Sequence, residues 1–178
     1  MAAPETSSRP LIRPAREDDA AALREIFNEA VQDSLTTFET EPRSLDEQRR
    51  LLAAAVQDAK HPVLAAELRG WVAGWITIQP YDPRPNLADV GEVTVFVRRQ
   101  FRNYGVGRHL MRAVQSDAQR LGYRKLIGRV LAESHDSLQL CRATGWREVG
   151  RHERHARRGA LLRDVVVVEY LVPPAPAS

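Results

Sequence analysis

Two glycines one residue apart, Gly105 and Gly107, stand among arginines between a strand-like run and a helix-like run. Residues 93–97 before them are all β-branched or aromatic, which favours a strand. The apolar residues after them recur at helical spacing: Val106, Leu110, Met111, Val114, Ala118 and Leu121. A helix N-terminus leaves backbone N–H groups free, and glycine lets a ligand approach the main chain. The segment is therefore predicted to bind a phosphate.

Two common phosphate-binding loops do not fit this spacing. A P-loop places Lys and then Ser or Thr after its last glycine, whereas Arg108 and His109 follow Gly107 here. A dinucleotide-binding turn needs a third glycine at the position that Leu110 occupies. Both interpretations fail on residues that the chemistry requires.

The remaining pattern, Arg102-x-x-Gly105-x-Gly107 after a hydrophobic strand, resembles the acyl-coenzyme A signature of the GNAT acetyltransferase superfamily. Other segments, in the same order over roughly residues 11–171, resemble its phosphinothricin acetyltransferase branch. They are Ile12-Arg13-Pro14-Ala15, Thr37-Phe38-Glu39-Thr40-Glu41-Pro42, Gly91-Glu92-Val93-Thr94-Val95-Phe96-Val97, Leu121-Gly122-Tyr123, Gly145-Trp146 and Asp164-Val165. The resemblance implies an N-acetyltransferase that moves an acetyl group directly from acetyl-coenzyme A (acetyl-CoA) to the primary amine of a small amino-acid-like or phosphinothricin-like molecule. It also implies a homodimer.

Length and composition predict one domain, at residues 11–172, with disordered tails at residues 1–10 and 173–178. No run of 18 apolar residues is present, so no membrane span is expected. The N-terminus lacks the apolar segment of a secretory signal. The single cysteine, Cys141, excludes an intrachain disulfide and a cysteine-based metal site, and no metal is expected. A cytoplasmic enzyme fits these observations.

The net charge of +3 is unevenly distributed. Between residues 98 and 129, Asp117 is the single acidic residue among many lysines and arginines, which suits the phosphates of coenzyme A. The basic run at residues 151–158 is the best support for the alternative of nucleic-acid binding. Because no helix-turn-helix or RNA-binding signature accompanies it, we expect no nucleic-acid partner.

Periodicity and turn residues predict a strand, two helices, three strands, a helix, a strand, a helix and two strands. Ser44 and Glu47 form a predicted capping box, and Ser134 is predicted to cap the last helix. The closing strands, residues 146–152 and 164–171, flank an arginine-rich connection. This is a mixed α/β (α+β) domain. Its order matches the GNAT fold, a mixed sheet of about seven strands flanked by about four helices, whose strands splay at the cofactor site.

Forming an amide from an amine and a thioester requires a base, because deprotonating an amine of pKa near 10 costs about 4 kcal/mol at pH 7. Glu92 lies at the mouth of the central strand and matches the catalytic glutamate of the branch. The resemblance therefore implies that Glu92 is the general base, acting directly or through water. The alternative is a strand-end glutamate in a surface ion pair.

The resemblance also assigns the cofactor contacts, which are mostly made by the main chain: Val95, Phe96, Val97, Arg102, Asn103, Tyr104, Gly105, Val106, Gly107, Arg108 and Ser134. Many members of the superfamily carry a tyrosine as general acid where this chain has Cys141, and the branch usually has a histidine. Because a buried cysteine is more often apolar packing than an acid, no general acid is assigned.

The acceptor site is less defined by the sequence. Phe38 is a candidate substrate contact, or else a cap over the core, and Tyr81 is a candidate contact, or else a rim aromatic. An acidic substrate would need a cation, for which Arg84, Arg129 and Arg163 are candidates. Two alternative functions remain open at this point: an N-terminal acetyltransferase of proteins or peptides, and a non-catalytic acyl-CoA-binding module.

Overall fold

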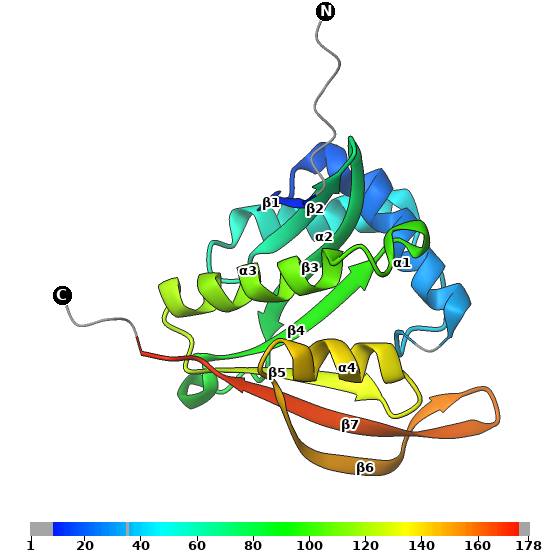
Figure 1. Cartoon of the computed structure of the whole chain (residues 1–178), viewed down its shortest axis with the longest axis vertical. Helices are drawn as coiled ribbons and strands as arrows, with labels where there is room; N and C mark the ends of the chain where they lie inside the picture. The colour runs from blue at the N-terminus through cyan, green and yellow to red at the C-terminus, as the bar shows by residue number, and fades with distance from the viewer. Residues whose placement is uncertain (1–8, 35, 175–178) are drawn as a thin grey trace, which may run out of the picture.

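The computed structural model describes residues 9–34 and 36–174, and within them one sheet of seven strands has the order β1-β2-β3-β4-β5-β7-β6 (Figure 1). The strands are β1 (Leu11–Pro14), β2 (Val63–Leu68), β3 (Trp71–Pro80), β4 (Val90–Val97), β5 (Lys125–Leu131), β6 (Arg147–Arg158) and β7 (Leu161–Leu171). The helices are α1 (Ala20–Asp33), α2 (Leu45–Gln57), α3 (Val106–Arg120) and α4 (His135–Ala143), with short 3-10 helices at Glu17–Asp19, Pro85–Leu87 and Arg99–Phe101. The predicted order and fold class are confirmed. The predicted tails fall mostly outside the described residues.

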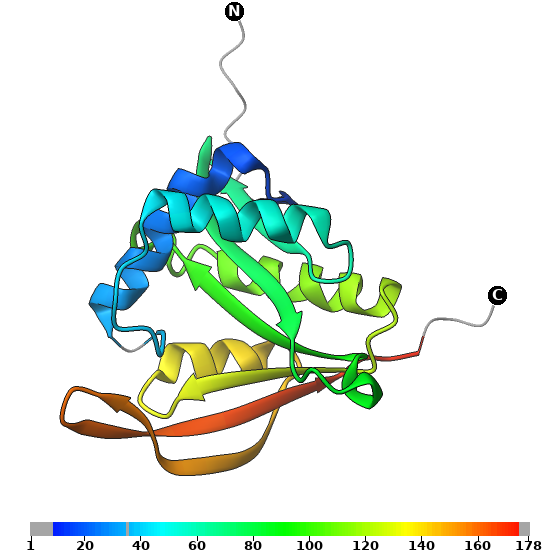
Figure 2. The ribbon, with the colours of Figure 1, turned by 180° about the vertical axis from the view of Figure 1, so that it is seen from behind.

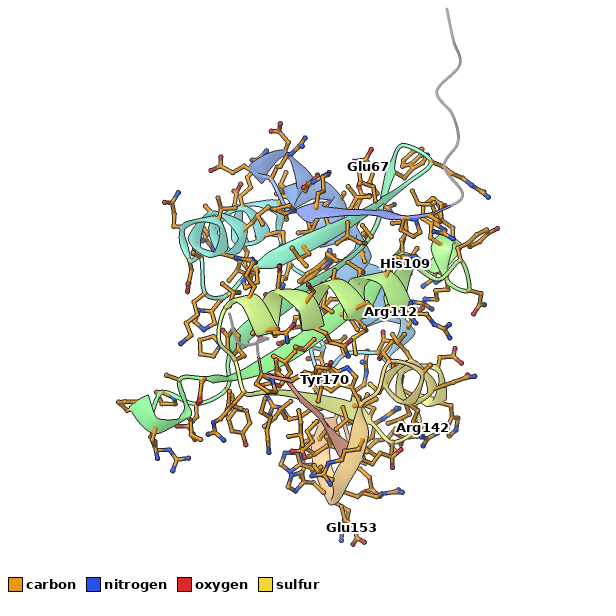
Figure 3. All side chains as sticks on the ribbon, turned by 60° about the vertical axis from the view of Figure 1, so that its left-hand side comes forward. Glu67, His109, Arg112, Arg142, Glu153 and Tyr170 are labelled. Atoms are coloured by element: carbon orange, nitrogen blue, oxygen red, sulfur yellow. The ribbon has the colours of Figure 1, made fainter. Side chains whose placement is uncertain are left out.

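The helices cover both faces of the sheet. α1 and α2 lie on one face, and α3 and α4 lie on the other, as the two opposite views show (Figures 1 and 2). Strand alternation divides the core accordingly. Trp75 and Phe96 pack under α1, whereas Ile76 and Val93 pack under α3. On the face covered by α3 and α4, exposed side chains such as Arg112 on α3 point away from the sheet (Figure 3).

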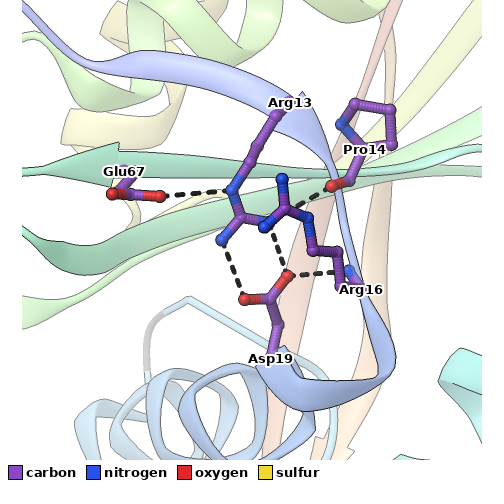
Figure 4. Close-up of polar contacts among 5 residues, drawn as sticks. All are labelled: Arg13, Pro14, Arg16, Asp19 and Glu67. Carbon is purple, nitrogen blue, oxygen red and sulfur yellow. Dashed lines mark hydrogen bonds and ion pairs between the residues drawn. The ribbon is translucent and has the colours of Figure 1, made fainter.

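A buried ion pair fixes the connection between β1 and α1 (Figure 4). The Arg13 guanidinium donates to both carboxylate oxygens of Asp19 at 2.7 and 2.9 Å, and to Glu67 at 3.2 Å. The backbone N–H of Arg16 also donates to Asp19, at 2.7 Å. Burial by itself would raise the pKa of Asp19, but these hydrogen bonds outweigh it and lower the pKa.

The sheet opens in its middle, between β4 and β5. Their parallel pairing covers only three residues and ends at the pair Glu92 and Ile127. β4 nevertheless continues to Val97, because its other edge stays paired with β3 up to Gly74. The predicted splay is therefore confirmed.

Three local predictions need correction. The arginine-rich connection is wrong, because β6 and β7 extend through it as a hairpin to a turn at Gly159, with a bulge between His152 and Ala156. The capping box is half formed: Ser44 accepts from the Glu47 N–H at 3.2 Å, but the structure records no return bond from the Glu47 carboxylate. Ser134 makes no side-chain cap, since its hydroxyl donates to the Ser137 hydroxyl at 2.8 Å instead.

Candidate active site

A cleft of about 260 Å³ lies where β4 and β5 separate. The loop between α1 and α2 contributes Phe38 to its wall, β4 contributes Glu92, β5 contributes Arg129, and α4 contributes Cys141. The cleft thus reaches from the face covered by α1 to the face covered by α4. It contains the predicted base at the point where the strand pairing ends.

The side chain of Glu92 is held in one position within this cleft. Its side chain is 17% exposed, and Arg129 donates to both carboxylate oxygens at 2.6 and 2.8 Å. The ion pair expected as the alternative for Glu92 does exist, but it lies inside the cleft. Arg129, a candidate to bind an acidic substrate, therefore already has a carboxylate partner.

The predicted phosphate turn has the backbone that its glycines suggested. Gly105 has φ of 77° and caps α3, and Asn103 has φ of 67°. The first N–H to donate within the helix is that of His109, to the Gly105 carbonyl at 3.1 Å. The N–H groups of residues 106–108 therefore precede the first intrahelical bond and are available to an anion. A Cβ on Gly107 would lie 3.0 Å from Leu140, so the first turn of α3 packs tightly on α4.

Acidic residues of α1 form hydrogen bonds and ion pairs with the segment just before this turn. The Arg99 N–H donates to Glu29 at 2.8 Å, and the guanidinium groups of Arg99 and Arg102 both pair with Asp33. Burial alone would raise the pKa of Asp33, but the hydrogen bonds from the two arginines lower it. The side chain of Arg102, a predicted cofactor contact, therefore faces α1, and its predicted role rests on the main chain.

Three of the other predicted cofactor residues line the cleft: Val95, Phe96 and Ser134. Val95 and Val97 are half-buried on the unpaired part of β4, and Phe96 is buried under α1. Ser134 is buried and lines the cleft, whereas Asn103 and Tyr104 are exposed beside the phosphate turn. The unpaired edge of β4 and the free amides at the start of α3 are groups that suit a long thioester arm with phosphates at its end.

Cys141 lines the inner part of the cleft and is buried. Burial raises the pKa of its thiol to about 11, so the thiol stays protonated at neutral pH. Its neighbours in the cleft wall include Met111, Leu140 and Trp146. The position of the usual general acid is thus occupied by a neutral, apolar group.

Of the predicted acceptor residues Phe38, Tyr81, Arg84 and Arg163, only Phe38 lines the cleft. Phe38 lines the cleft and is 42% exposed, whereas Tyr81 is exposed on a loop that does not line it. Arg84 folds back onto Asp82, with Nε 2.7 Å from Oδ1. Arg163 lines a separate cavity of about 10 Å³ beside Phe38. Sequence reasoning missed Arg43, which lines the cleft but stands in a loop without any periodic pattern.

Among the described residues, no group of three or more His, Cys, Asp or Glu side chains could hold a metal ion. No helix among them is long and apolar enough to cross a membrane.

Comparisons with known proteins agree with this geometry. The family model described as an acetyltransferase (GNAT) domain matches residues 9–147. A phosphinothricin N-acetyltransferase from Streptomyces viridochromogenes is 30% identical over 139 residues, covering 76% of this chain and 73% of that protein. A ribosomal-protein-alanine N-acetyltransferase from Brucella melitensis has a TM-score of 0.86 at 28% identity, covering 90% of this chain and 99% of the other.

A phosphinothricin acetyltransferase of the GNAT superfamily from Sinorhizobium meliloti, solved with acetyl-CoA, has a TM-score of 0.85 at 21% identity, covering 94% of each chain. This likeness shows the fold, and the sequence matches show the family. The chain is an acetyltransferase that belongs to the GNAT family, in the branch of the phosphinothricin acetyltransferases.

Proposed function

We propose that the protein transfers the acetyl group of acetyl-CoA directly to the primary amine of a small amino-acid-like or phosphinothricin-like molecule, with Glu92 as general base. The observation that carries this proposal is the position of Glu92. It lies in the cleft at the last residue of β4 that pairs with β5, next to the strand edge that the proposed donor would occupy.

When bound, acetyl-CoA supplies the acetyl group as a thioester. The chain supplies the binding groups: the main-chain N–H groups of residues 103–108 for the phosphates, and the free edge of β4 at residues 95–97 for the arm. In this proposal, a main-chain N–H on this edge polarises the thioester carbonyl. Ser134 borders the same part of the cleft.

Glu92 takes the proton of the ammonium group, directly or through a water molecule, and the free amine attacks the thioester carbonyl. The new C–N bond replaces the C–S bond, and coenzyme A leaves as a thiolate that takes its proton from water. Arg129 keeps the Glu92 carboxylate in one orientation through its two hydrogen bonds. Cys141 keeps its own proton because burial raises its pKa to about 11, and we assign no general acid.

A second candidate function is acetylation of a protein or peptide N-terminus. The solved relative from Brucella melitensis carries such a name, and its identity to this chain is 28%. The small-molecule function is preferred because a phosphinothricin N-acetyltransferase is 30% identical to this chain over 139 residues. The loop between α1 and α2 also forms part of the cleft wall, since Phe38 and Arg43 both line the cleft.

A thiol-release assay tests the proposal, because each transfer frees one thiol of coenzyme A. The acceptor panel should contain phosphinothricin, amino acids, their carboxamides, polyamines and a peptide that begins with alanine. We expect turnover with small amines that exceeds turnover with the peptide. Turnover with the peptide alone would favour the second function, and no turnover with any amine would reject both.

Two further expectations rest on the family resemblance. We expect a homodimer, so light scattering should give about twice the 20.0 kDa of one chain. We also expect a cytoplasmic location, which fractionation of the source cells would test.

A further inference from the structure

Arg43 is a cation in the wall of the cleft that contains Glu92. It stands at the end of the loop between α1 and α2, directly before Ser44, the N-cap of α2. The side chain of Asn28 on α1 clamps its backbone from both sides. The Arg43 N–H donates to Asn28 Oδ1 at 2.8 Å, and the Arg43 carbonyl accepts from Asn28 Nδ2 at 3.1 Å. The position of the arginine is thus fixed by a long-range contact.

The guanidinium of Arg43 lies on the ring of Phe27, with Cζ 3.6 Å from the ring centroid. Phe27 is fully buried and packs edge-on against Phe96 at 5.5 Å, and Phe96 in turn contacts Trp75. These packed aromatic rings therefore fix the position of the planar Arg43 guanidinium relative to the core. All four side chains line the cleft.

Most of the hydrogen-bonding capacity of Arg43 is unused within the described part of the chain. A guanidinium has five N–H donors. Its recorded side-chain hydrogen bond goes from Nη1 to Gln48 Oε1, at 3.3 Å. No carboxylate of residues 9–34 or 36–174 forms an ion pair with it, although Glu39 and Glu47 act on it from a distance. Partial burial of a charged guanidinium without a paired anion costs free energy of solvation. This burial lowers the pKa of Arg43.

The other arginines considered for an acidic substrate are less suitable. Arg129 is occupied by Glu92, and Arg84 is occupied by Asp82. Arg163 lines a different and much smaller cavity. Arg43 therefore combines three properties: it lines the same cleft as Glu92, it is held rigidly, and its donors are free for a bidentate anion.

We propose that Arg43 binds the acidic group of the acceptor, so that the enzyme selects amines that carry a carboxylate, a phosphinate or a similar oxyanion. The proposal rests on the proposed small-amine function and adds to it the residue that determines specificity. Arg43 does not take part in the chemical step. It orients the acceptor so that its amine faces the part of the cleft that holds Glu92.

The test compares L-methionine with L-methioninamide, which differ in the carboxylate. The wild-type enzyme should prefer L-methionine by at least about tenfold in kcat/KM. In Arg43→Met, kcat/KM for L-methionine should fall about 10- to 100-fold, the range of a lost charge-assisted hydrogen-bond pair. For L-methioninamide it should fall less than about threefold. Comparing the two ratios cancels the different amine basicities of the two acceptors.

Two variants complete the design. Arg43→Lys keeps the charge but not the planar fork, so it should recover part of the loss, and only for L-methionine. Arg49→Met removes an exposed arginine of α2 that pairs with Asp46, and it should leave both acceptors unchanged. The melting temperature of each variant shows whether it is folded.

The outcomes separate the two proposals. Equal losses for both acceptors, or no loss for either, overturn the assignment of Arg43 while the acetyltransferase function stands. A wild-type preference for the carboxamide also overturns it. Failure of the wild type to acetylate any amine in the wider panel rejects the proposed function, and the role of Arg43 with it.

Discussion

Arg129 on β5 forms a bidentate ion pair with Glu92 on β4, with Nε 2.6 Å from Oε1 and Nη2 2.8 Å from Oε2. Arg129 follows Ile127 by two residues, and Ile127 is the last residue of β5 to pair with β4. The ion pair therefore bridges the two strands where their backbones begin to separate. It joins the proposed base to the opposite wall of the cleft.

Glu92→Gln should lower kcat at least about tenfold at pH 7, because an amide cannot accept the proton of the ammonium. The KM for acetyl-CoA should stay within about twofold, since the phosphate turn is untouched. Steady-state kinetics by thiol release measure both constants. Glu148→Gln is the control, because Glu148 pairs with Arg142 at the surface, and it should behave as wild type. Unchanged turnover in the Glu92 variant would remove Glu92 from its role.

Arg129→Gln should lower kcat about three- to tenfold, because Glu92 loses two charge-assisted hydrogen bonds and its preferred orientation. The KM for acetyl-CoA should not change, and Arg129→Lys should restore part of the loss. The two kinetic constants distinguish a role in orienting Glu92, which changes kcat, from a role in binding the acceptor, which changes its KM. A raised KM for the acceptor with an unchanged kcat would show instead that Arg129 binds the acidic group of the substrate.

Gly105→Ala should raise the KM for acetyl-CoA about fivefold or more, because a Cβ at φ of 77° strains the turn that presents the helix amides. Gly122→Ala is a matched control. Gly122 has φ of 78° and follows the other end of α3, with no atom near a new Cβ. Both variants should lose about 1 kcal/mol of stability, but only Gly105→Ala should bind the donor more weakly. Equal KM values would contradict the phosphate assignment.

Asp19→Asn should destabilise the fold by about 2–3 kcal/mol, because it leaves the mostly buried Arg13 with a weaker partner. Urea denaturation measures this loss. Asp46→Asn, which affects an exposed pair with Arg49, should change stability by less than about 0.5 kcal/mol. The effect of Asp19 should also depend on pH. Since folding lowers the pKa of Asp19, its contribution is present above about pH 4 and is lost as the pH falls further. The variant should therefore lose less stability between neutral pH and pH 3 than the wild type, and an equal loss would contradict this.

The sequence predicted most of the fold because its patterns are local. The helix from Val106 and the strand Lys125–Leu131 follow directly from apolar spacing, and Gly122 ends the helix with a positive φ. β6 was predicted too short for a physical reason. It is an edge strand whose residues are mostly exposed on both faces, so it lacks the alternation that marks a half-buried strand. Its pairing with the valine-rich β7 makes it a strand.

The site was predicted unevenly. Glu92 and the phosphate turn belong to one continuous segment, so a single motif could indicate them. The ion pair of Glu92 joins residues 37 positions apart, and the clamp on Arg43 joins residues 15 positions apart. No spacing rule covers such contacts, which depend on how the strands and the loop are packed.

The opening between β4 and β5 gives β4 two different edges. From Val93 to Val97, one edge is hydrogen-bonded to β3 and the other has no strand partner. In an antiparallel pair, successive residues direct their N–H groups to opposite sides. Backbone amides along this part of β4 should therefore alternate between slow and fast exchange with deuterium, residue by residue. A single strand in the centre of the sheet thus combines a rigid support on one edge with a row of N–H groups that lack a strand partner on the other.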